Sequence, residues 1–232
     1  MIISVPSYVI PGTYAENVEA LVARTEIQGI ELLFYMYDPD SRELLIREKS
    51  RIEAWHGRFR YSLHMPDVLR PEHEELLELT GGFVERYILH VPPQACGSHG
   101  DPRDCSRFCR LVESWRTRYG ERFLLENCIG RSFEPLASRL EGLPICCDTG
   151  HLLIESAGLE GFLGRYGERV REVHLHGVRE GGDHRDFAPD EPWFLQAVPF
   201  LRAFGGVVNL EVFSIAEVDA LLAVLRAHGL LG

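Results

Sequence analysis

Short apolar runs of the kind that form buried strands alternate along this chain with segments of helical periodicity. Eight such runs are expected to be strands: Ile2–Val5, Gly29–Phe34, Phe59–Met65, Arg86–Val91, Phe123–Asn127, Pro144–Asp148, Val170–His176 and Val207–Phe213. Their starts recur about every 29 residues, which is the length of one strand–helix unit in a parallel sheet. This alternation predicts an α/β protein whose strands run in parallel.

The segments between these runs carry apolar residues at helical spacing. We expect helices at Tyr14–Thr25, Ser41–Trp55, Glu72–Phe83, Pro102–Tyr119, Phe133–Leu140, near Leu152–Tyr166 with interruptions at Gly158 and Gly161, Glu191–Phe204 and Ile215–His228. The first and the last helix are each preceded by a capping-box pattern, Thr13 with Glu16 and Ser214 with Glu217. Helices are therefore expected after all eight strands.

Eight strands and eight helices in alternation predict a (β/α)8 TIM barrel, formed as a single domain over residues 1–232. A length of 232 residues suits one such domain. The rival architecture, an open doubly wound sheet, needs fewer strands and a glycine-rich phosphate loop after the first strand, which this sequence lacks. The two longest connections, Pro92–Asp101 and Gly177–Pro192, both follow strands. We expect both to lie over the catalytic face of the barrel.

Polar side chains stand at or just after the carboxyl ends of the last six expected strands. They are His64, His90, Glu126, Asp148, His151, His174, His176, Asp183, His184 and Glu211. A barrel brings these strand ends together at one mouth, where unpaired His and carboxylate groups are costly to bury. Divalent metal ions resolve this cost because each accepts several nitrogen and oxygen ligands. The mixture of imidazoles and carboxylates favours Mn, Zn or Fe over Ca or Mg.

Each of these residues taken alone has a simpler interpretation. His90 is the kind of strand-end histidine that a core hydrogen bond can hold, Glu126 could pair with Arg131, and Asp148 could cap the next helix. His176 could be structural or could face the substrate. The pattern at six consecutive strands favours the metal site.

Composition excludes several classes of function. The chain has 24 Lys and Arg against 35 Asp and Glu, a formal charge of −11, which makes nucleic acid an unlikely partner because duplex binding needs cationic contacts to phosphates. No run approaches about 18 uninterrupted apolar residues, so we expect no membrane span. The first residues lack the basic start and apolar core of a secretion signal, so a cytoplasmic location is expected.

The six cysteines form no C-x-x-C pair. Cys128, Cys146 and Cys147 lie in apolar runs and are expected to be small buried side chains. Cys96, Cys105 and Cys109 lie in a polar loop and the helix after it, where a second small metal site is the alternative to simple burial.

Four short motifs resemble those of the xylose isomerase-like TIM barrels, a superfamily that includes AP endonuclease family 2. They are Cys147-Asp148-Thr149-Gly150-His151, His174-Leu175-His176-Gly177, Glu126-Asn127 and Leu210-Glu211. The resemblance implies a metal core of Glu126, Asp148, His174 and Glu211. It also implies that His64, His90, His151, Asp183 and His184 are the additional ligands of phosphodiesterases that hold two or three metals. The family loop usually reads D-x-H, whereas this chain reads Gly182-Asp183-His184-Arg185-Asp186, so Asp186 remains the alternative to Asp183.

A narrower resemblance runs through Ser7–Val18, Gly29–Phe34, Val173–Val178, Asp183-His184 and Leu210–Phe213. Together these segments are similar to the cobamide-remodelling phosphodiesterases of the AP endonuclease family 2 type. The resemblance implies a small-molecule phosphodiester substrate, the nucleotide loop of a cobamide, opened during corrinoid salvage.

For such a hydrolase we expect Glu126 and Glu211 to be the catalytic carboxylates, with Glu126 orienting the nucleophile. His176, Arg179, Arg185 and Tyr8 are the expected substrate contacts. The two arginines are equally consistent with exposed loop residues, and Tyr8 and Tyr14 with packing roles.

Three rival functions remain at this stage. A single-metal sugar isomerase or epimerase needs only Glu126, Asp148, His174 and Glu211. A DNA-repair endonuclease conflicts with the acidic charge. A non-catalytic barrel conflicts with the cost of burying an idle set of His and carboxylate groups. The oligomeric state is left open.

Overall fold

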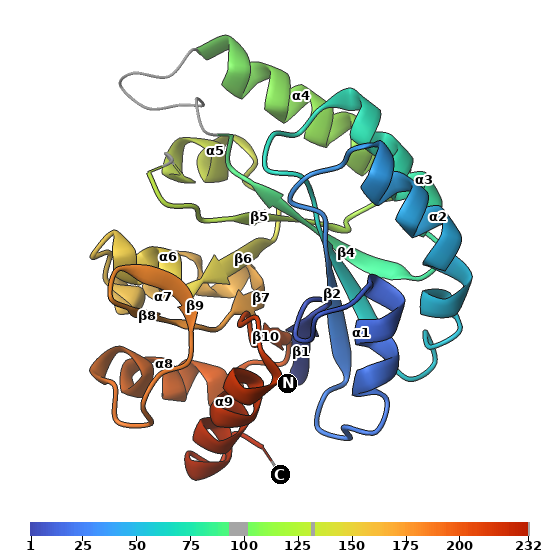
Figure 1. Cartoon of the computed structure of the whole chain (residues 1–232). Helices are drawn as coiled ribbons and strands as arrows, with labels where there is room; N and C mark the ends of the chain where they lie inside the picture. Colours follow the sequence, from blue (N-terminus) through green and yellow to red (C-terminus); the bar gives the residue numbers. More distant parts are fainter. Residues whose placement is uncertain (93–101, 131–132, 232) are drawn as a thin grey trace.

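A closed barrel of eight parallel strands forms the centre of the molecule in the computed structural model, which describes residues 1–92, 102–130 and 133–231 (Figure 1). The strands are β1 (Ile2–Pro6), β2 (Gly29–Leu33), β3 (Arg60–His64), β4 (Val84–His90), β5 (Phe123–Glu126), β6 (Ile145–Asp148), β7 (Val170–His174) and β10 (Val207–Asn209). Their order round the barrel follows the sequence, and β10 closes it against β1. The (β/α)8 fold predicted from the alternation is confirmed.

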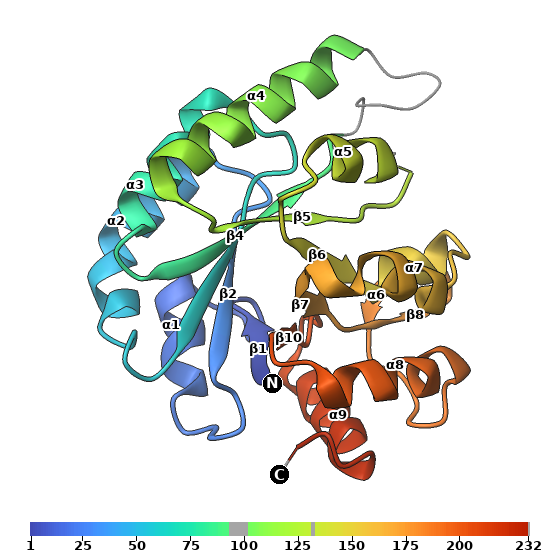
Figure 2. The same cartoon turned by 180° about the vertical axis from the view of Figure 1, so that it is seen from behind.

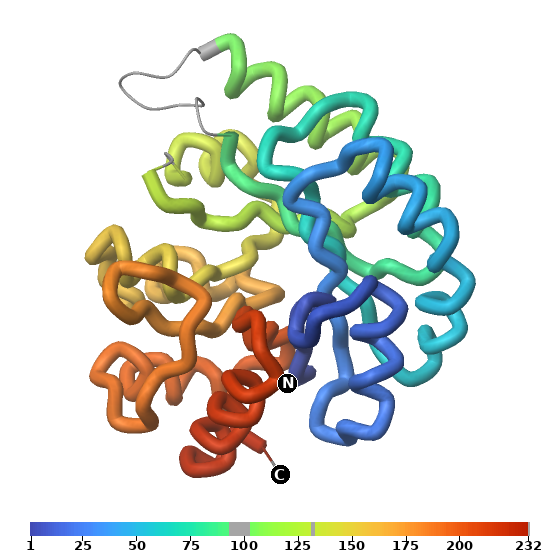
Figure 3. The backbone as a smooth tube through the Cα atoms, viewed as in Figure 1, coloured from blue at the N-terminus to red at the C-terminus, as the bar shows by residue number. Residues whose placement is uncertain are grey.

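Helices surround the barrel on its outside, and two views from opposite sides show them as an outer ring (Figures 1 and 2). They are α1 (Tyr14–Leu21), α2 (Pro39–Glu53), the 3₁₀ turn η1 (Pro71–His73), α3 (Glu74–Thr80), α4 (Pro102–Tyr119), α5 (Phe133–Arg139), α6 (Thr149–Ile154), α7 (Leu159–Tyr166), the 3₁₀ turn η2 (Gly167–Arg169), α8 (Pro192–Ala203) and α9 (Ile215–Ala227). The chain passes once round the ring, which brings its two ends close together (Figure 3). No helix in the described ranges is long and apolar enough to cross a membrane.

Local capping explains where several helices begin. Thr13 caps α1 with a reciprocal capping box to Glu16, as the sequence predicts. Ser214 caps α9 by accepting a hydrogen bond from the Glu217 amide, but its hydroxyl also donates to the Glu217 carboxylate. The second capping box is therefore only half formed.

The last two barrel strands are shorter than predicted. β7 ends at His174 and β10 ends at Asn209, because these two residues form the last pair between the strands. His176 and Glu211 consequently lie just beyond the strands rather than in them.

The connection after β7 contains a small antiparallel hairpin, β8 (Gly177–Arg179) with β9 (Gly182–Arg185). The sequence did not predict it, since glycine and charged residues have low strand propensity. The expected helix near Leu152–Tyr166 is divided into α6 and α7, and Gly158 is the N-cap of α7.

Most of the apolar core lies between the barrel and its helices, while the barrel interior is largely polar. A small separate apolar cluster, Ile88, Leu124 and Cys146, lies on three adjacent strands. Residues two apart on a strand share a face, so the paired Ile88 and Leu124 lie beneath His90 and Glu126, whereas Cys146 is level with Glu126. These side chains form a small apolar patch on one side of the otherwise polar barrel interior.

Candidate metal centre

The strand ends place the predicted ligands in a ring at the carboxyl end of the barrel. The last residues of β3, β4, β5, β6 and β7 are His64, His90, Glu126, Asp148 and His174, and Glu211 follows β10 by two residues. Register holds them side by side, with His90 opposite Glu126 and Asp148 opposite His174. The structure therefore brings together groups that are up to 147 residues apart in the sequence.

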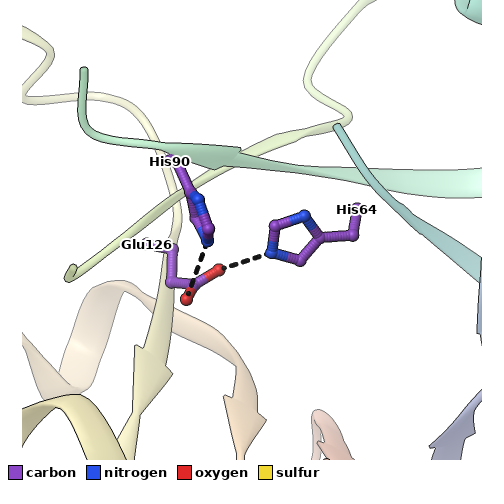
Figure 4. Close-up of side chains that lie close together, drawn as sticks. All are labelled: His64, His90 and Glu126. Carbon is purple, nitrogen blue, oxygen red and sulfur yellow. Dashed lines mark ion pairs between the residues drawn. The ribbon is translucent and has the colours of Figure 1, made fainter. Parts of the chain in front are cut away.

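His64, His90 and Glu126 form the first group of this centre (Figure 4). The two Nε2 atoms lie 3.3 and 3.4 Å from the two carboxylate oxygens of Glu126. Nδ1 of His64 lies 3.0 Å from the carbonyl oxygen of Met65, and Nδ1 of His90 is hydrogen-bonded to Asp67. Because the outer nitrogens donate to these acceptors, both Nε2 lone pairs face the centre, which is how metal-binding histidines are oriented.

The second group consists of Glu126, Asp148, His174 and Glu211, all of them buried. Nδ1 of His174 lies 2.9 Å from Glu211 Oε2, 3.7 Å from Glu126 Oε2 and 3.9 Å from Asp148 Oδ2. Despite this closeness, His174 Nδ1, Glu126 Oε2 and Glu211 Oε2 make no hydrogen bond within the described part of the chain.

Buried polar atoms that converge without hydrogen-bonding one another are costly. A divalent cation at their common point would satisfy all of them, and the donor set of imidazole nitrogen and carboxylate oxygen suits Mn, Zn or Fe. The residues present therefore fit a metal ion.

The third group, His151, Asp183 and His184, is looser, and its histidines also belong to two tighter sets, Glu126–Asp148–His151 and His176–His184–Glu211. Asp183 lies 3.0 Å from His184 Nδ1 and 3.9 Å from His151 Nε2. Nδ1 of His151 lies 2.8 Å from the backbone oxygen of Asn127, which again leaves Nε2 facing the group. Asp186, the alternative to Asp183, instead pairs with Arg179 on the hairpin. The geometry thus favours Asp183 as the acidic member.

His176 is fully buried beside this group and contacts its neighbours. Its Nδ1 accepts a hydrogen bond of 2.9 Å from the backbone N–H of His184, so Nε2 carries the proton and donates to Asp148 at 3.1 Å. A Cβ atom at Gly150 would lie 2.0 Å from the His176 ring, which explains why glycine stands there. His176, expected to contact the substrate, thus lies among the candidate ligands, hydrogen-bonded to Asp148 and grouped with His184 and Glu211 as a possible metal site.

The charges of the centre are strongly coupled. Burial disfavours the imidazolium forms, but the surrounding carboxylates outweigh it and raise the pKa of His90 to about 9, of His151 to about 10 and of His184 to about 9. Burial likewise opposes ionisation of Glu126 and Glu211, yet the neighbouring histidines hold the pKa of both carboxyls well below its usual range. In the metal-free protein, protonated histidines therefore carry the positive charge beside the carboxylates that a metal ion would otherwise supply.

The other expected substrate contacts lie at the edge of the mouth. Arg179 and Arg185 are exposed on the hairpin, and Arg185 has Glu217 at 3.9 Å. Tyr8 is 59% exposed and meets Phe213 edge-on at 6.4 Å. The partners of these three side chains in the described structure are thus Asp186, Glu217 and Phe213 rather than the candidate ligands.

Several residues that orient the ligands were missed from the sequence. Glu31 on β2 is buried, with its Oε2 3.0 Å from His174 Nε2 and 2.7 Å from the Asn209 amide. Tyr35 donates a hydrogen bond of 3.0 Å to Glu211. A charged residue within the apolar run Gly29–Phe34 was the available signal, since an unpaired carboxylate is costly in such a strand.

The cysteine expectations have mixed outcomes. Cys146 and Cys147 are buried in β6 and Cys128 is buried just after β5, as expected. Cys105 and Cys109 are buried in α4, and Cys105 is disulfide-bonded, so it has no free thiolate for the second metal site that was the alternative. Cys96 and the connection at 93–101 lie outside the described residues.

Comparison with known proteins agrees with this fold. The sequence matches no protein-family model, and no curated protein matches it significantly. Among solved structures, it is similar to a 3-keto-D-glucoside 4-epimerase from E. coli, with 16% identity over 97% of this chain and 99% of that one and a TM-score of 0.68. An L-ribulose 3-epimerase shares 15% identity over 98% and 86% of the two chains, with a TM-score of 0.66.

An AP endonuclease, family 2, from Brucella melitensis is also similar, with 16% identity over 97% of this chain and 98% of that one and a TM-score of 0.63. At these identities the likeness concerns the fold. The chain has the fold of the xylose isomerase-like TIM barrels, with a cluster of His and carboxylate groups at its mouth that fits divalent metal ions.

Proposed function

We propose that this protein is a metal-dependent phosphodiesterase of the AP endonuclease family 2 type that holds two or three ions of Mn, Zn or Fe. The observation that carries the proposal is the size of the ligand set. Two further groups, His64–His90–Glu126 and His151–Asp183–His184, adjoin the four-residue core. A single-metal enzyme needs only the core, and multi-metal sites are typical of phosphoryl hydrolases.

Glu126 lies where these groups meet. One of its oxygens lies 3.3 Å from His64 Nε2, and the other lies 3.4 Å from both His90 Nε2 and His151 Nδ1. Bound divalent ions would supply positive charge to the phosphate oxygens and lower the pKa of the attacking water. Glu126 would orient that water for attack on phosphorus, while Glu211, tied to Tyr35 and His174, would complete the core.

The remaining residues act on the bound phosphodiester. Hydrolysis adds water across one P–O bond, so the departing oxygen leaves on one product and the other product keeps the phosphate. Arg179 and Arg185, at the exposed edge of the mouth, are placed to meet phosphate charge by turning from Asp186 and Glu217. Surface ion pairs are weak enough for such an exchange.

We further propose that the phosphodiester is the nucleotide-loop linkage of a cobamide, opened during corrinoid salvage and remodelling. This step is supported by the sequence segments at Ser7–Val18, Val173–Val178 and Leu210–Phe213. In the structure, the first and the last of these segments lie next to each other, since Tyr8 contacts Phe213. Two segments that resemble the cobamide-remodelling phosphodiesterases therefore lie side by side at the mouth of the barrel.

The second candidate is a single-metal sugar isomerase or epimerase. The observation in its favour is that the carboxylates of Glu126, Asp148 and Glu211 all lie within 3.9 Å of His174 Nδ1, a set large enough for one ion, and two of the similar structures described above are sugar epimerases. For that function, the groups around His90 and Asp183 would have no role.

A metal count combined with two assays separates these candidates. We expect two or more equivalents of Mn, Zn or Fe per chain in protein purified without chelator. Incubation with a cobamide should release the corrinoid and nucleotide fragments, detected by chromatography and mass spectrometry, with no turnover of ketoses. One equivalent of metal together with ketose epimerisation, and no cleavage of any phosphodiester, would contradict the phosphodiesterase proposal.

A further inference from the structure

A cavity of about 440 Å³ opens beside the metal centre, between the loops that follow β1 and β2. Its wall includes Tyr8, Tyr14, Tyr35, Met36, Leu44 and Phe213. Several of these side chains are unusually exposed for their type, Met36 at 75% and Tyr8 at 59%. Exposed apolar patches that line a concave surface commonly mark binding sites.

The cavity is continuous with the ligand groups through shared residues. Tyr35 donates to Glu211 Oε1 at 3.0 Å, and its ring contacts the His64 ring edge-on at 4.6 Å between centroids. Phe213 stacks on His184 at 4.8 Å. A molecule whose reacting group lies on the metal ligands therefore has its adjoining part in this cavity.

Three hydroxyls of the wall make hydrogen bonds within the protein. The Tyr14 hydroxyl donates to the Leu33 carbonyl at 3.1 Å, the Ser7 hydroxyl accepts from the Leu33 amide at 3.2 Å, and Ser41 is engaged with Asp38. Burial and nearby carboxylates raise the pKa of Tyr14 to about 12, so its phenol is neutral. A sugar or a second phosphate would find few free partners here, whereas an aromatic ring needs none.

We propose that this cavity binds a planar aromatic group that the substrate carries next to its phosphodiester. The inference rests on the proposed function, which identifies the reacting group as a phosphodiester. It adds the chemical class of the substituent next to that phosphodiester. Cavities of roughly 300–1,000 Å³ enclose most of a drug-sized ligand, so a fused-ring group fits. Four aromatic side chains in the wall offer faces and edges for stacking against it.

Two synthetic diesters with the same leaving group test the proposal in the metal-loaded enzyme. They are dimethyl phosphate, which carries no aromatic group, and methyl 2-naphthylmethyl phosphate, each hydrolysed to methanol and the corresponding monoester, which phosphorus NMR detects. We expect kcat/KM to be at least about 10-fold higher for the naphthylmethyl diester, mostly through KM, because burying a fused ring contributes a kcal/mol or more. A ratio near one in the wild-type protein would overturn the proposal.

Matched variants locate the effect. The double variant Met36→Ala/Leu44→Ala should lower that ratio by about 5-fold or more, since it removes apolar wall area. The control Ile46→Ala/Leu195→Ala, which truncates two equally apolar exposed side chains outside the cavity, should keep the ratio. The single variant Met36→Ala serves if the double variant fails to fold. An equal fall in the control would overturn the assignment to this cavity.

A binding measurement separates this inference from the proposed function. Ligand-observed NMR with metal-free protein should show saturable binding of 2-naphthylmethanol, weakened about 10-fold in Met36→Ala/Leu44→Ala and weaker still for cyclohexylmethanol. This result without hydrolysis of either diester would support the cavity while contradicting the phosphodiesterase. Absence of saturable binding, or equal binding of cyclohexylmethanol, would overturn the aromatic subsite.

Discussion

Two buried glutamates of the barrel, Glu126 on β5 and Glu172 on β7, have carboxyl groups whose pKa values are shifted in opposite directions. Glu172 lies lower in the barrel, accepts a hydrogen bond of 3.0 Å from Ser62 and has Arg86 at 3.7 Å. Burial and the nearby Glu31 raise the pKa of its carboxyl to about 7. Glu126 is as deeply buried, yet neighbouring histidines hold its pKa well below the usual range.

The difference shows that burial alone does not identify a metal ligand. Burial without enough positive charge nearby raises the pKa of a carboxyl, as it does for Glu172. A buried carboxyl among imidazoles stays ionised and can accept a cation when the imidazoles release their protons. The lower layer of the barrel is thus a hydrogen-bonded polar layer, and the upper layer is the candidate metal centre.

The strongest test of this contrast replaces each glutamate by glutamine. Glu126→Gln should lower phosphodiester hydrolysis by at least about 1,000-fold, because an amide neither orients the nucleophile as a base nor carries the charge shared by His64, His90 and His151. Glu172→Gln, which removes an equally buried carboxyl from the layer below, should keep activity within a few-fold. Steady-state rates on one phosphodiester with equal metal loading give the comparison. An active Glu126→Gln protein would remove Glu126 from the mechanism.

The next test separates the groups within the upper layer. His64→Ala/His90→Ala should lose about one equivalent of metal per chain while keeping the ion of the four-residue core, because only the first group depends on these rings. Elemental analysis after dialysis measures the loss, and circular dichroism checks the fold. Metal content that does not change in the double variant would show that His64 and His90 are ordinary core residues and would favour the sugar isomerase.

Metal binding should release protons from the upper layer. Since the pKa values of His90, His151 and His184 are raised to about 9, 10 and 9, these rings are protonated at pH 7 in the metal-free protein. Apparent metal affinity should therefore rise about 10-fold per pH unit for each proton released, up to roughly pH 9. Calorimetry in Tris and HEPES at pH 7, whose ionisation enthalpies differ, counts the protons. Buffer-independent heats would contradict the charges assigned to this layer.

The smallest expected effect concerns the stability of the lower layer. Because the folded pKa of Glu172 is raised to about 7, above its unfolded value, the folded state binds more protons and stability falls as pH rises from about 4.5 to 7.5. Glu172→Gln cannot ionise, so relative to wild type it should gain about 1–3 kcal/mol between pH 5 and 8. Thermal melts of the two metal-free proteins at pH 5 and at pH 8 measure this difference in stability. A constant difference between the two proteins would show that Glu172 titrates normally.

The fold and most of the ligand set followed from sequence because both depend on local periodicity. Strand-length apolar runs ended by His, Asp or Glu predict a barrel with polar groups at one mouth, and register indeed brings His90 to Glu126 and Asp148 to His174. Glu31 was missed because it lies in the middle of its strand, whereas the other polar groups stand at strand ends. The hairpin β8–β9 was missed because its residues have low strand propensity, and its two strands are defined only by their pairing with each other.

The amino-acid sequence by itself determined the order of strands and helices, the sign of the charge and the kinds of side chain that reach the mouth. Only the tertiary structure decided which nitrogens of His64 and His176 face inward, that the carboxylate of Asp183 lies beside the His184 ring while that of Asp186 pairs with Arg179, and that His176 contacts Asp148. It also revealed the aromatic cavity beside Glu211, whose wall comes from three separate loops. These features depend on distances between residues far apart in the chain, which periodicity does not encode.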